Sequence, residues 1–579
     1  MKALCFLAAG VFAIATTAMA QPAINEGGVV NGASYLPGIV PGSIFVIKGS
    51  GLGPATLLQA SSLPYQTTLS NTSITFTPAS GGAAIQALMV YTWNAQLAAL
   101  LPSTAAPGDY NVTVTYNGLS SAPVSAKVVA RNFGFVTQAS SGSGPAQATY
   151  GGFDLNRFTT GSVAFGGHTW SLRPAVVGNT LVLWGTGAGA DTKSDLNGAS
   201  TGDQTTAGGF IVSVGGVDVK PAYLGRSAGI PGLDQANFTI PASVAPGCFV
   251  SVQVRGNGFT SNVGTIAVVA KGQSSCSSPT LSQAQLARLD LGGTITVGSL
   301  ALSKISSSLN LAGTGAFTSK SESAGGSFAK YTIDAVATAP FSLNQIGACY
   351  VYRRSGTTQE ISQGGTTVTS LNAGSQLTLN GPNASNVAMP ISAGGGNFYG
   401  ATLYSNGFNG VGGSGSPTLT QGTYTISGTG GSDIGPFSAS VTFPGDFTWT
   451  NQDTIADPIP RTSPLTVNWT GGTTGLVSIT GTTYTSLTGS TTQNTIYNAS
   501  LFTCIAQATA GTFTVPVSVL SQLDAVSGDL TTGSYGSLSV FATISPTQGS
   551  FTAPLKAGGN IDQGVFGYSI GGTKTTGYQ

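Results

Sequence analysis

The sequence predicts an all-β protein made of tandem β-sandwiches followed by a further β-rich region. Three observations lead to this prediction. An apolar strand at residues 41–54 runs into alternating glycines, and the same pattern returns at residues 177–190. Asn-Gly pairs follow alternating strands, as they do in hairpins. The first module lacks any segment with a sustained helical period. At 579 residues the chain is too long for one core, so several domains are expected.

The first module spans residues 24–132. Residues 110–116 read Y-N-V-T-V-T-Y, and this alternation places two tyrosines and two valines on one face of a strand. Asn117-Gly118 then supplies a hairpin turn, and residues 126–130 form the returning strand.

The second module, residues 133–272, repeats the landmarks of the first in the same order. Q-A-N-F-T-I-P at 235–241 corresponds to Q-L-A-A-L-L-P at 96–102, and each is followed five residues later by Pro-Gly. A repeated order of landmarks indicates an internal duplication.

At these landmarks both modules resemble the IPT/TIG branch of immunoglobulin-like β-sandwiches. The opening N-x-A-S-Y-x-P-G at residues 31–38 and the G-S-G-L-G and Q-x-N-F-x-I-P elements are similar to a paired repeat of secreted acidobacterial proteins. The resemblance covers residues 24–272. The first module departs from it at Ala98, where the second has Asn237. The resemblance implies an extracellular, all-β, non-catalytic scaffold and does not imply a ligand.

The remaining chain is expected to contain a linker and two further β regions. Residues 273–285 are rich in Ser and Gln and predict a linker, which Cys276 would pin to the preceding sandwich. Residues 286–444 predict a β-rich domain with an exposed glycine-rich loop at 406–416, and residues 445–579 a C-terminal sandwich-like domain. Whether 286–579 forms one compound unit or two stays open.

The N-terminus predicts a signal peptide at residues 1–20. Lys2 precedes an apolar stretch at 3–14, and Ala18-Met19-Ala20 forms a small-x-small cleavage site. The alternative is a membrane anchor, but the apolar run is shorter than the roughly 20 residues of a span. With no later membrane span predicted, we expect a secreted or cell-surface protein after cleavage near Ala20.

The charge of the chain excludes a nucleic-acid partner. Charged residues make up 7% of the sequence, and 20 basic residues balance 19 acidic ones. Apart from Arg353-Arg354 there is no basic cluster to neutralise phosphates. We expect an extracellular protein or glycan as partner, and no cofactor.

The four cysteines that remain after signal cleavage predict disulfides, because an even number in an exported protein favours pairing. The sequence permits three pairings. We prefer Cys248–Cys276, which flanks one predicted hairpin, together with Cys349–Cys504. A zinc site is excluded because there is no C-x-x-C and only one histidine.

The glycine runs invite a dinucleotide-binding interpretation, which needs a following helix and an acidic residue about 20 positions on. Pro54 follows the first run, with no acidic residue until Asp109, and no helix follows the second. The glycines are therefore expected to allow bulged turns and close backbone approach. The only histidine, His168, lacks a nucleophile elbow nearby and is expected in a loop or edge strand.

Acidic residues offer one weak metal candidate. Asp191, Asp195, Asn197 and Asp203 form the densest acidic loop, a candidate calcium site, although Lys193 breaks the EF-hand register. The alternative is a solvated interdomain loop. The glutamates that remain after signal cleavage, Glu26, Glu322 and Glu360, are all expected in polar, turn-like settings, so no catalytic residue is predicted.

Aromatic residues could stack on sugars, although most alternating aromatics lie in sandwich cores. The candidates are Trp449, Trp469, Tyr350 and Tyr352. The preferred hypothesis is a non-catalytic binding or structural protein. The alternative is a polysaccharide-acting enzyme, which would show a C-terminal cleft with two carboxylates roughly 5–10 Å apart. A third is an adhesin or filament subunit with an exposed edge strand.

Overall fold

The computed structural model describes most of the chain downstream of the predicted signal peptide, which lies outside the described residues. The described residues are 21–150, 154–165, 167–198, 202–311, 315–334, 346–356, 368–392, 397–408, 411–472, 475–486, 495, 497–530, 533–544 and 549–579. Strands dominate them and helices are few and short, which confirms the all-β fold class. None of the helices in these ranges has the length and apolar character of a membrane span.

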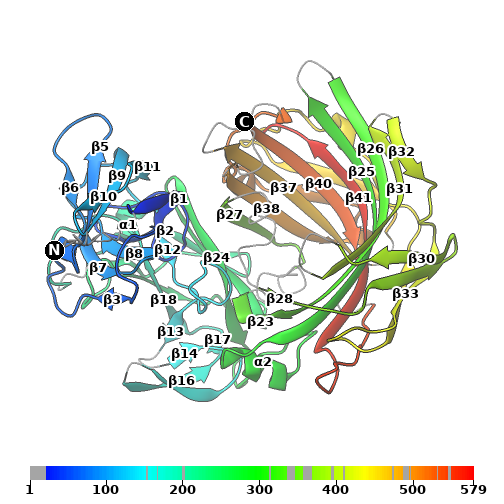
Figure 1. Ribbon diagram of the computed structural model, residues 1–579, viewed down its shortest axis with the longest axis horizontal. Coiled ribbons are helices and arrows are strands. Elements are labelled where there is room, and N and C mark those ends of the chain that lie inside the picture. The colour runs from blue at the N-terminus through cyan, green and yellow to red at the C-terminus, as the bar shows by residue number, and fades with distance from the viewer. Residues whose placement is uncertain are drawn as a thin grey trace, which may run out of the picture.

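Domain 1 is a sandwich of two antiparallel sheets around an apolar core (Figure 1). One sheet has the order β1 (Ala23–Asn31), β2 (Ile44–Ser50), β8 (Gln96–Leu100), β7 (Leu88–Thr92) and β3 (Leu58–Gln59). The other has the order β10 (Leu119–Ser120), β9 (Gly108–Tyr116), β5 (Thr72–Pro78) and β4 (Thr68–Leu69), with β11 (Val124–Val128) and β6 (Ile85–Gln86) pairing β9 and β5. Tyr110, Val112 and Val114 of β9 are buried, as the alternation predicted.

Domain 2 repeats this arrangement with added strands. Its first sheet has the order β15 (Gly161–Phe165), β16 (His168–Arg173), β14 (Asp154–Asn156), β13 (Ala148–Tyr150), β18 (Thr180–Thr186), β22 (Asp234–Thr239) and β21 (Tyr223–Arg226), with β12 (Gly134–Phe135) on β18. Its second has the order β17 (Ala175–Val176), β24 (Phe259–Val269), β23 (Gly247–Gly256), β19 (Ile211–Val214) and β20 (Val217–Val219). The β18–β22 pair matches β2–β8, and β19–β23 matches β5–β9. Ala98 opposes Val46, and Asn237 opposes Val182, at equivalent positions.

The glycine runs serve backbone packing. A Cβ on Gly49 would collide with the carbonyl oxygen of Ala23, and a Cβ on Gly185 with that of Gly134. Gly51 and Gly187 have positive φ, at 63° and 101°. Among the described residues between the second run and β19, the only helix is the one-turn α1 (Thr205–Gly208). Close approach therefore accounts for these glycines, as the sequence analysis expected.

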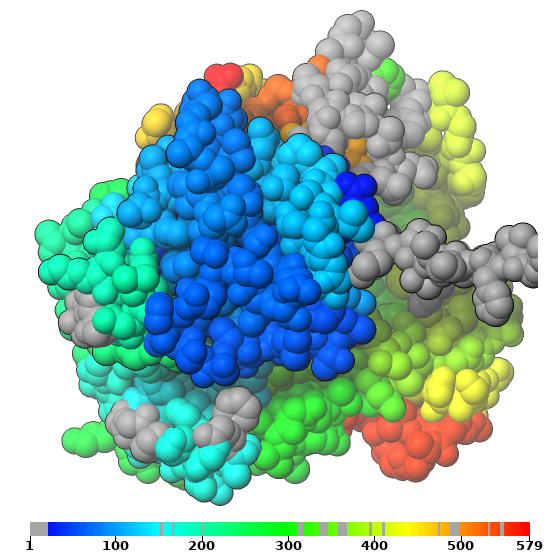
Figure 2. Space-filling model, turned by 60° about the vertical axis from the view of Figure 1, so that its left-hand side comes forward, coloured from blue at the N-terminus to red at the C-terminus, as the bar shows by residue number. Residues whose placement is uncertain are grey.

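Domains 1 and 2 are joined by buried polar contacts. Figure 2 shows domain 1, in blue, in front of the rest of the chain. The Asp195 carboxylate accepts hydrogen bonds from the backbone N–H and the hydroxyl of Ser103, both at 2.7 Å. The Asn31 amide donates to the carbonyl of Thr186 in domain 2 at 3.3 Å, and to that of Asn132, the last residue of domain 1, at 3.0 Å. Because these groups are buried, their geometry fixes one relative placement of the two domains.

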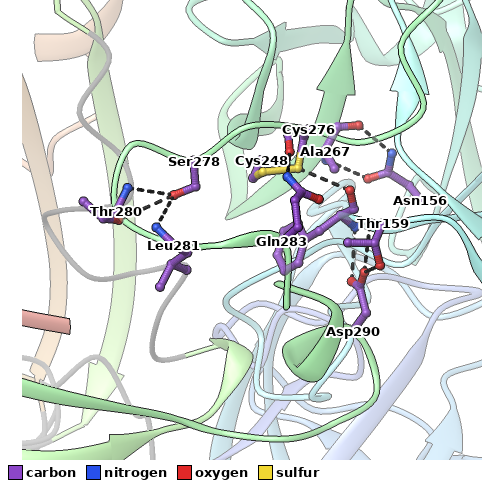
Figure 3. The surroundings of a disulfide bond; sticks show 11 residues. Asn156, Thr159, Cys248, Ala267, Cys276, Ser278, Thr280, Leu281, Gln283 and Asp290 are labelled. Carbon is purple, nitrogen blue, oxygen red and sulfur yellow. Dashed lines mark hydrogen bonds between the residues drawn. A yellow bond between two sulfur atoms is a disulfide. The ribbon is translucent and has the colours of Figure 1, made fainter. Parts of the chain in front are cut away.

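A helix, α2 (Gln283–Asp290), begins within the expected linker, 273–285, and ends within the expected β-rich domain, 286–444. Ser282 and Gln285 form a capping box at its start, and Leu286 and Leu289 are fully buried against domain 2. Its last residue, Asp290, accepts hydrogen bonds from the backbone N–H groups of Phe158 and Thr159 (Figure 3). The segment is thus a packed junction, because its apolar residues are buried at helical spacing.

Figure 3 also shows the Cys248–Cys276 disulfide beside this junction. It ties the segment before α2 to β23, as the preferred pairing anticipated.

The C-terminal unit is organised around one large sheet, which contains ten strands among the described residues. Nine of them follow one another in the order β27 (Cys349–Gly356), β38 (Tyr497–Gln507), β37 (Leu476–Ser486), β40 (Ser534–Thr543), β41 (Gln563–Thr575), β25 (Ile295–Leu311), β26 (Gly315–Tyr331), β31 (Phe398–Phe408) and β32 (Val411–Gly415). The tenth, β28 (Val368–Leu371), also pairs with β26. Figure 1 shows these strands side by side.

This sheet takes strands from both sides of residue 444, where the sequence analysis placed a domain boundary. Residues 297–308 of β25 pair in parallel with residues 563–574 of β41. Cys349 on β27 lies opposite Cys504 on β38, and the two form the second disulfide. Residues 286–444 and 445–579 therefore share one sheet and do not form two independent sandwiches.

Two smaller sheets cover one face of the large sheet. One has the order β30 (Ala384–Pro390), β29 (Gln376–Gly381), β33 (Gly422–Gly428) and β34 (Phe437–Phe443), and the other β35 (Thr448–Trp449), β36 (Leu465–Thr470) and β39 (Thr512–Val515). One continuous core joins all three sheets, with Leu302, Leu379 and Val467 as fully buried members. We call the covered face of the large sheet its core face and the opposite face its outer face.

Candidate functional site

A cleft of about 550 Å³ opens where the core face of the large sheet emerges from under the two smaller sheets. Its floor is formed by β25, β26, β31 and β41, and one wall by residues 446–452, which lead into and follow β35. Strand register explains the floor. Lys304 pairs with Glu322 and with Ile570, and Glu322 pairs with Tyr404. These positions continue the alternation of buried Leu300 and Leu302, so the apolar core face becomes polar as it reaches solvent.

Three of the four charged residues that line the cleft contact one another, and the fourth, Lys320, is exposed. The Lys304 ammonium lies 3.9 Å from Oε1 of Glu322 and 3.1 Å from Oδ1 of Asp446, and it donates to the carbonyl of Leu419 at 3.2 Å. Oε2 of Glu322 accepts hydrogen bonds from the backbone N–H groups of Thr418 and Leu419, at 2.6 and 2.8 Å. The Glu322 side chain is 4% exposed, whereas that of Asp446 is 85% exposed. The buried carboxylate therefore anchors the 417–419 turn that borders the cleft.

Aromatic rings form much of the remaining lining. Trp449 is 6% exposed, and its indole N–H donates to Oδ1 of Asn451 at 3.1 Å, which fixes the ring. Tyr404 is half-buried, and its hydroxyl makes no hydrogen bond to another described residue. Gly572 lies beneath Trp449, with its Cβ position 3.5 Å from the ring, so a glycine keeps the floor open there.

The cleft holds two carboxylates, Glu322 and Asp446. A polysaccharide-acting enzyme was expected to hold two at a separation of roughly 5–10 Å. Both contact the same ammonium, and both oxygens of Glu322 are engaged in the bonds given above. A glycosidase needs one carboxylic acid that can give a proton to the leaving group. Glu322, which is buried and holds the turn, is poorly placed for that role. The arrangement suits binding better than proton transfer.

Glu322 corrects one expectation. The sequence analysis placed all three glutamates in polar, turn-like settings, but Glu322 lies within β26 and is buried, and Glu26 lies within β1. The β26 segment reads T-S-K-S-E-S-A-G-G-S, whose apolar content is too low to indicate a strand. Glu360 lies outside the described residues.

The candidate calcium residues have separate partners. Asp195 binds Ser103, Oδ1 of Asp191 accepts from the N–H of Lys193, and Oδ1 of Asp203 accepts from Thr205. Within the described ranges no three His, Cys, Asp or Glu side chains come together as a metal group would require. The acidic loop instead contacts domain 1 through Asp195 and Ser103. The spacing of the acidic residues in the sequence could not indicate this contact.

The other candidates lie apart from the cleft, except for Trp449. His168 begins β16 and is exposed, but β16 lies between β15 and β14 and is not the edge strand of the sheet. Trp469 is 3% exposed and belongs to the core, as the core interpretation expects, whereas Tyr350 is 5% exposed but lies opposite Thr503, on the outer face of the large sheet. Lys304, Asp446 and Tyr404 were not singled out by the sequence, because 142 residues separate Lys304 from its partner Asp446.

The edge strand that an adhesin would offer is present at β32, whose five residues are all exposed. Gly407, Gly412 and Gly415 in this hairpin have φ values of 66°, 78° and 73°, which depart from strand geometry. Such irregularity blunts an edge against pairing with another chain.

Comparisons with known proteins add little. No protein-family model and no curated protein match the sequence. SGBP-B of the Bacteroides ovatus mixed-linkage glucan utilization locus, solved in complex with a mixed-linkage heptasaccharide, is 14% identical, with a TM-score of 0.19. That match covers 44% of this chain and 48% of the other, so the chain spans about half of it. A tetra-tandem repeat from the extending region of a large adhesion protein is 11% identical over 93% of this chain and 97% of its own, with a TM-score of 0.12. Likenesses this weak carry no argument about function.

Proposed function

We propose that this chain is an exported, non-catalytic binding protein that holds a neutral carbohydrate in the cleft around Lys304, Glu322 and Asp446. The observation that carries the proposal is the internal pairing of the charges. The Lys304 ammonium already contacts both carboxylates, and the exposed Lys320 is the one further charged residue of the lining. The cleft therefore offers a ligand mainly hydroxyls, carbonyls and ring edges. Sugars are bound by such a mixture of polar groups and aromatic surface.

Export is supported by the signal-peptide pattern of residues 1–20 and by the two disulfides, which persist in oxidising compartments. The proposed location is extracellular, either released or at the cell surface. We further infer that domains 1 and 2 are IPT/TIG-type modules, on the basis of their shared landmarks and matching strand pairs. They would act as a fixed stem, because buried polar contacts join them to each other and α2 joins them to the C-terminal unit.

A second candidate function is hydrolysis of an extracellular polysaccharide, which the presence of two carboxylates in one cleft favours. It predicts that the chain releases reducing ends and that Glu322→Gln or Asp446→Asn abolishes the release. Binding without release argues against it.

The test is affinity electrophoresis of residues 21–579 in gels containing neutral polysaccharides: a β-glucan, a xylan and a galactomannan. We expect retardation by at least one of them and no release of reducing ends. Tyr404→Ala should weaken binding about tenfold, because a half-buried ring on the cleft wall is lost. Tyr116→Ala, a half-buried tyrosine of domain 1, is the matched control and should bind as the wild type does. Retardation by none of the three, or equal effects of both variants, would overturn the proposal.

A further inference from the structure

The outer face of the large sheet carries an unbroken row of hydroxyl side chains. Six consecutive strands, from β38 to β26 in sheet order, each place one Ser or Thr in this row (Figure 1 shows the strands). Its members are Thr503, Thr480, Ser539, Thr573, Ser307 and Ser319, each opposite the next in register. Neighbouring strands lie about 4.8 Å apart, so the row spans roughly 24 Å. We call it the hydroxyl row.

The row is accessible and partly ordered. All six residues are half-buried, while their strand neighbours Ile479, Cys504 and Val540 are fully buried on the core face. The hydroxyls of Thr480 and Thr503 lie 3.2 Å apart, and those of Ser539 and Thr573 lie 2.9 Å apart. These cross-strand contacts orient the hydroxyls before any ligand binds, which lowers the entropic cost of binding.

The outer face around the row carries no charge on its central strands. The charged residues of β25, β26 and β41 lie at even-numbered positions, which the register assigns to the core face. They are Lys304, Lys320, Glu322, Lys330 and Lys574. Strands β37, β38 and β40 contain no Asp, Glu, Lys or Arg. On the neighbouring strand β27, Arg354 lies on this face next to Tyr484, so only the central strands are without charge and suit an uncharged ligand.

Aromatic rings lie on both sides of the row. Tyr484 and Tyr535 are stacked with ring centroids 5.0 Å apart, and Tyr497 meets Tyr484 edge-on at 5.7 Å. Four residues of strand, about 13 Å, separate Tyr484 from Thr480. In the opposite direction, Phe398 is 52% exposed beside a shallow hollow of about 380 Å³. It lies opposite Ser327, which is eight residues along β26 from Ser319, or about 26 Å. Sugar rings present apolar C–H surface that such aromatic rings can contact.

We propose that the outer face binds an extended, neutral polysaccharide along the hydroxyl row, at a site separate from the cleft. The ligand class rests on the proposed function, whereas the site rests on the register and the burial given above. A protein partner is disfavoured because protein interfaces centre on large apolar anchors and Arg, which the six members of the row do not supply. The row offers donors and acceptors at strand spacing, as the repeated hydroxyls of a polysaccharide require.

The test uses Thr480→Val/Thr503→Val/Thr573→Val, which removes three hydroxyls and keeps the shape and β-branching of the side chains. Its matched control is Thr180→Val/Thr239→Val, which removes another exposed cross-strand pair at 3.0 Å in domain 2. Affinity electrophoresis in the same three polysaccharides should show at least about a tenfold loss for the triple variant and none for the control. Thermal unfolding should show that both variants melt as the wild type does.

The outcomes separate the two proposals. If Tyr404→Ala weakens binding and the triple variant does not, the outer-face site is overturned and the cleft stands. If the triple variant alone weakens binding, the outer face stands and the cleft is overturned. Retardation of the wild type by none of the polysaccharides overturns both. Sedimentation provides a further check. If the wild type sediments as a dimer and the triple variant as a monomer, this face is a contact between two copies of the chain, and the inference is overturned.

Discussion

Arg226 and Asp234 are cross-strand neighbours on β21 and β22, and their guanidinium and carboxylate lie 3.2 Å apart with both side chains 1% exposed. Asp234 also accepts from the N–H of Ala188 at 2.7 Å, and Arg226 donates to the carbonyl of Gly189 at 3.0 Å. The pair therefore holds the end of the second glycine run, which continues into the loop that binds Ser103 of domain 1.

Breaking this pair should be strongly destabilising. Arg226→Met leaves the Asp234 carboxylate buried without its cation, and we expect a loss of about 3–5 kcal/mol in the free energy of unfolding. Arg255→Met, in the exposed pair with Asp218, should cost about 1 kcal/mol or less. Denaturant unfolding of both variants provides the measurement. Similar losses in the two variants would contradict the buried role of Arg226.

Asp290 should make stability depend on pH. Burial raises the pKa of this carboxyl above its ordinary value of 3.8, against the opposing hydrogen bonds from Phe158 and Thr159. The folded protein then holds the proton more tightly than the unfolded chain does. Stability contributed by this group is therefore present at low pH and falls as pH rises from about 4 through the raised pKa.

The check is a comparison with Asp290→Asn, which cannot ionise. On lowering the pH from 7 to 4, the melting temperature of the wild type should rise relative to that of the variant. A constant difference, or one of opposite sign, would show that Asp290 does not titrate in this way.

The two disulfides should differ in their contribution to stability. Cys349–Cys504 closes a separation of 155 residues and Cys248–Cys276 one of 28. In the chain-entropy picture these correspond to about 5 and about 3.5 kcal/mol. Cys349→Ala/Cys504→Ala should therefore lower the unfolding midpoint more than Cys248→Ala/Cys276→Ala does, and a reducing agent should lower the melting temperature of the wild type. Calorimetry of the three proteins decides this, and the reverse order would contradict it.

Alanine at the equivalent glycines should destabilise both N-terminal domains. Gly49→Ala and Gly185→Ala each force a Cβ against a carbonyl oxygen of a neighbouring strand, so we expect losses of about 1–3 kcal/mol. Gly161→Ala is the control, because Leu172 is its nearest neighbour at an ordinary 3.8 Å. It should be neutral or stabilise by about 0.5 kcal/mol. Thermal unfolding provides the measurement. If Gly161→Ala loses as much stability as Gly49→Ala and Gly185→Ala, close packing at these two glycines is contradicted.

Local patterns predicted much of the N-terminal half. The Tyr110–Val114 alternation places its side chains in the core, and Asn117 and Gly118 adopt the positive φ values, 49° and 82°, of a hairpin turn. Helix α2 was missed because Gln283 and Gln285 lie in a Ser- and Gln-rich stretch. Leu286 and Leu289, which are spaced for one face of a helix, were assigned to the following β-rich region. The cleft was missed for another reason: Lys304 and Glu322 lie in strands poor in apolar residues.

The sequence by itself determined the class of the fold and the duplication of domains 1 and 2, because both depend on residue type at short or repeated spacing. It left three disulfide pairings open, of which the tertiary structure contains one. Only the tertiary structure decided that β25 pairs with β41, that Asp446 meets Lys304, and that six hydroxyls align across six strands. Strand pairing over such separations is set by the register of whole sheets and by the burial of one face, which no local pattern contains.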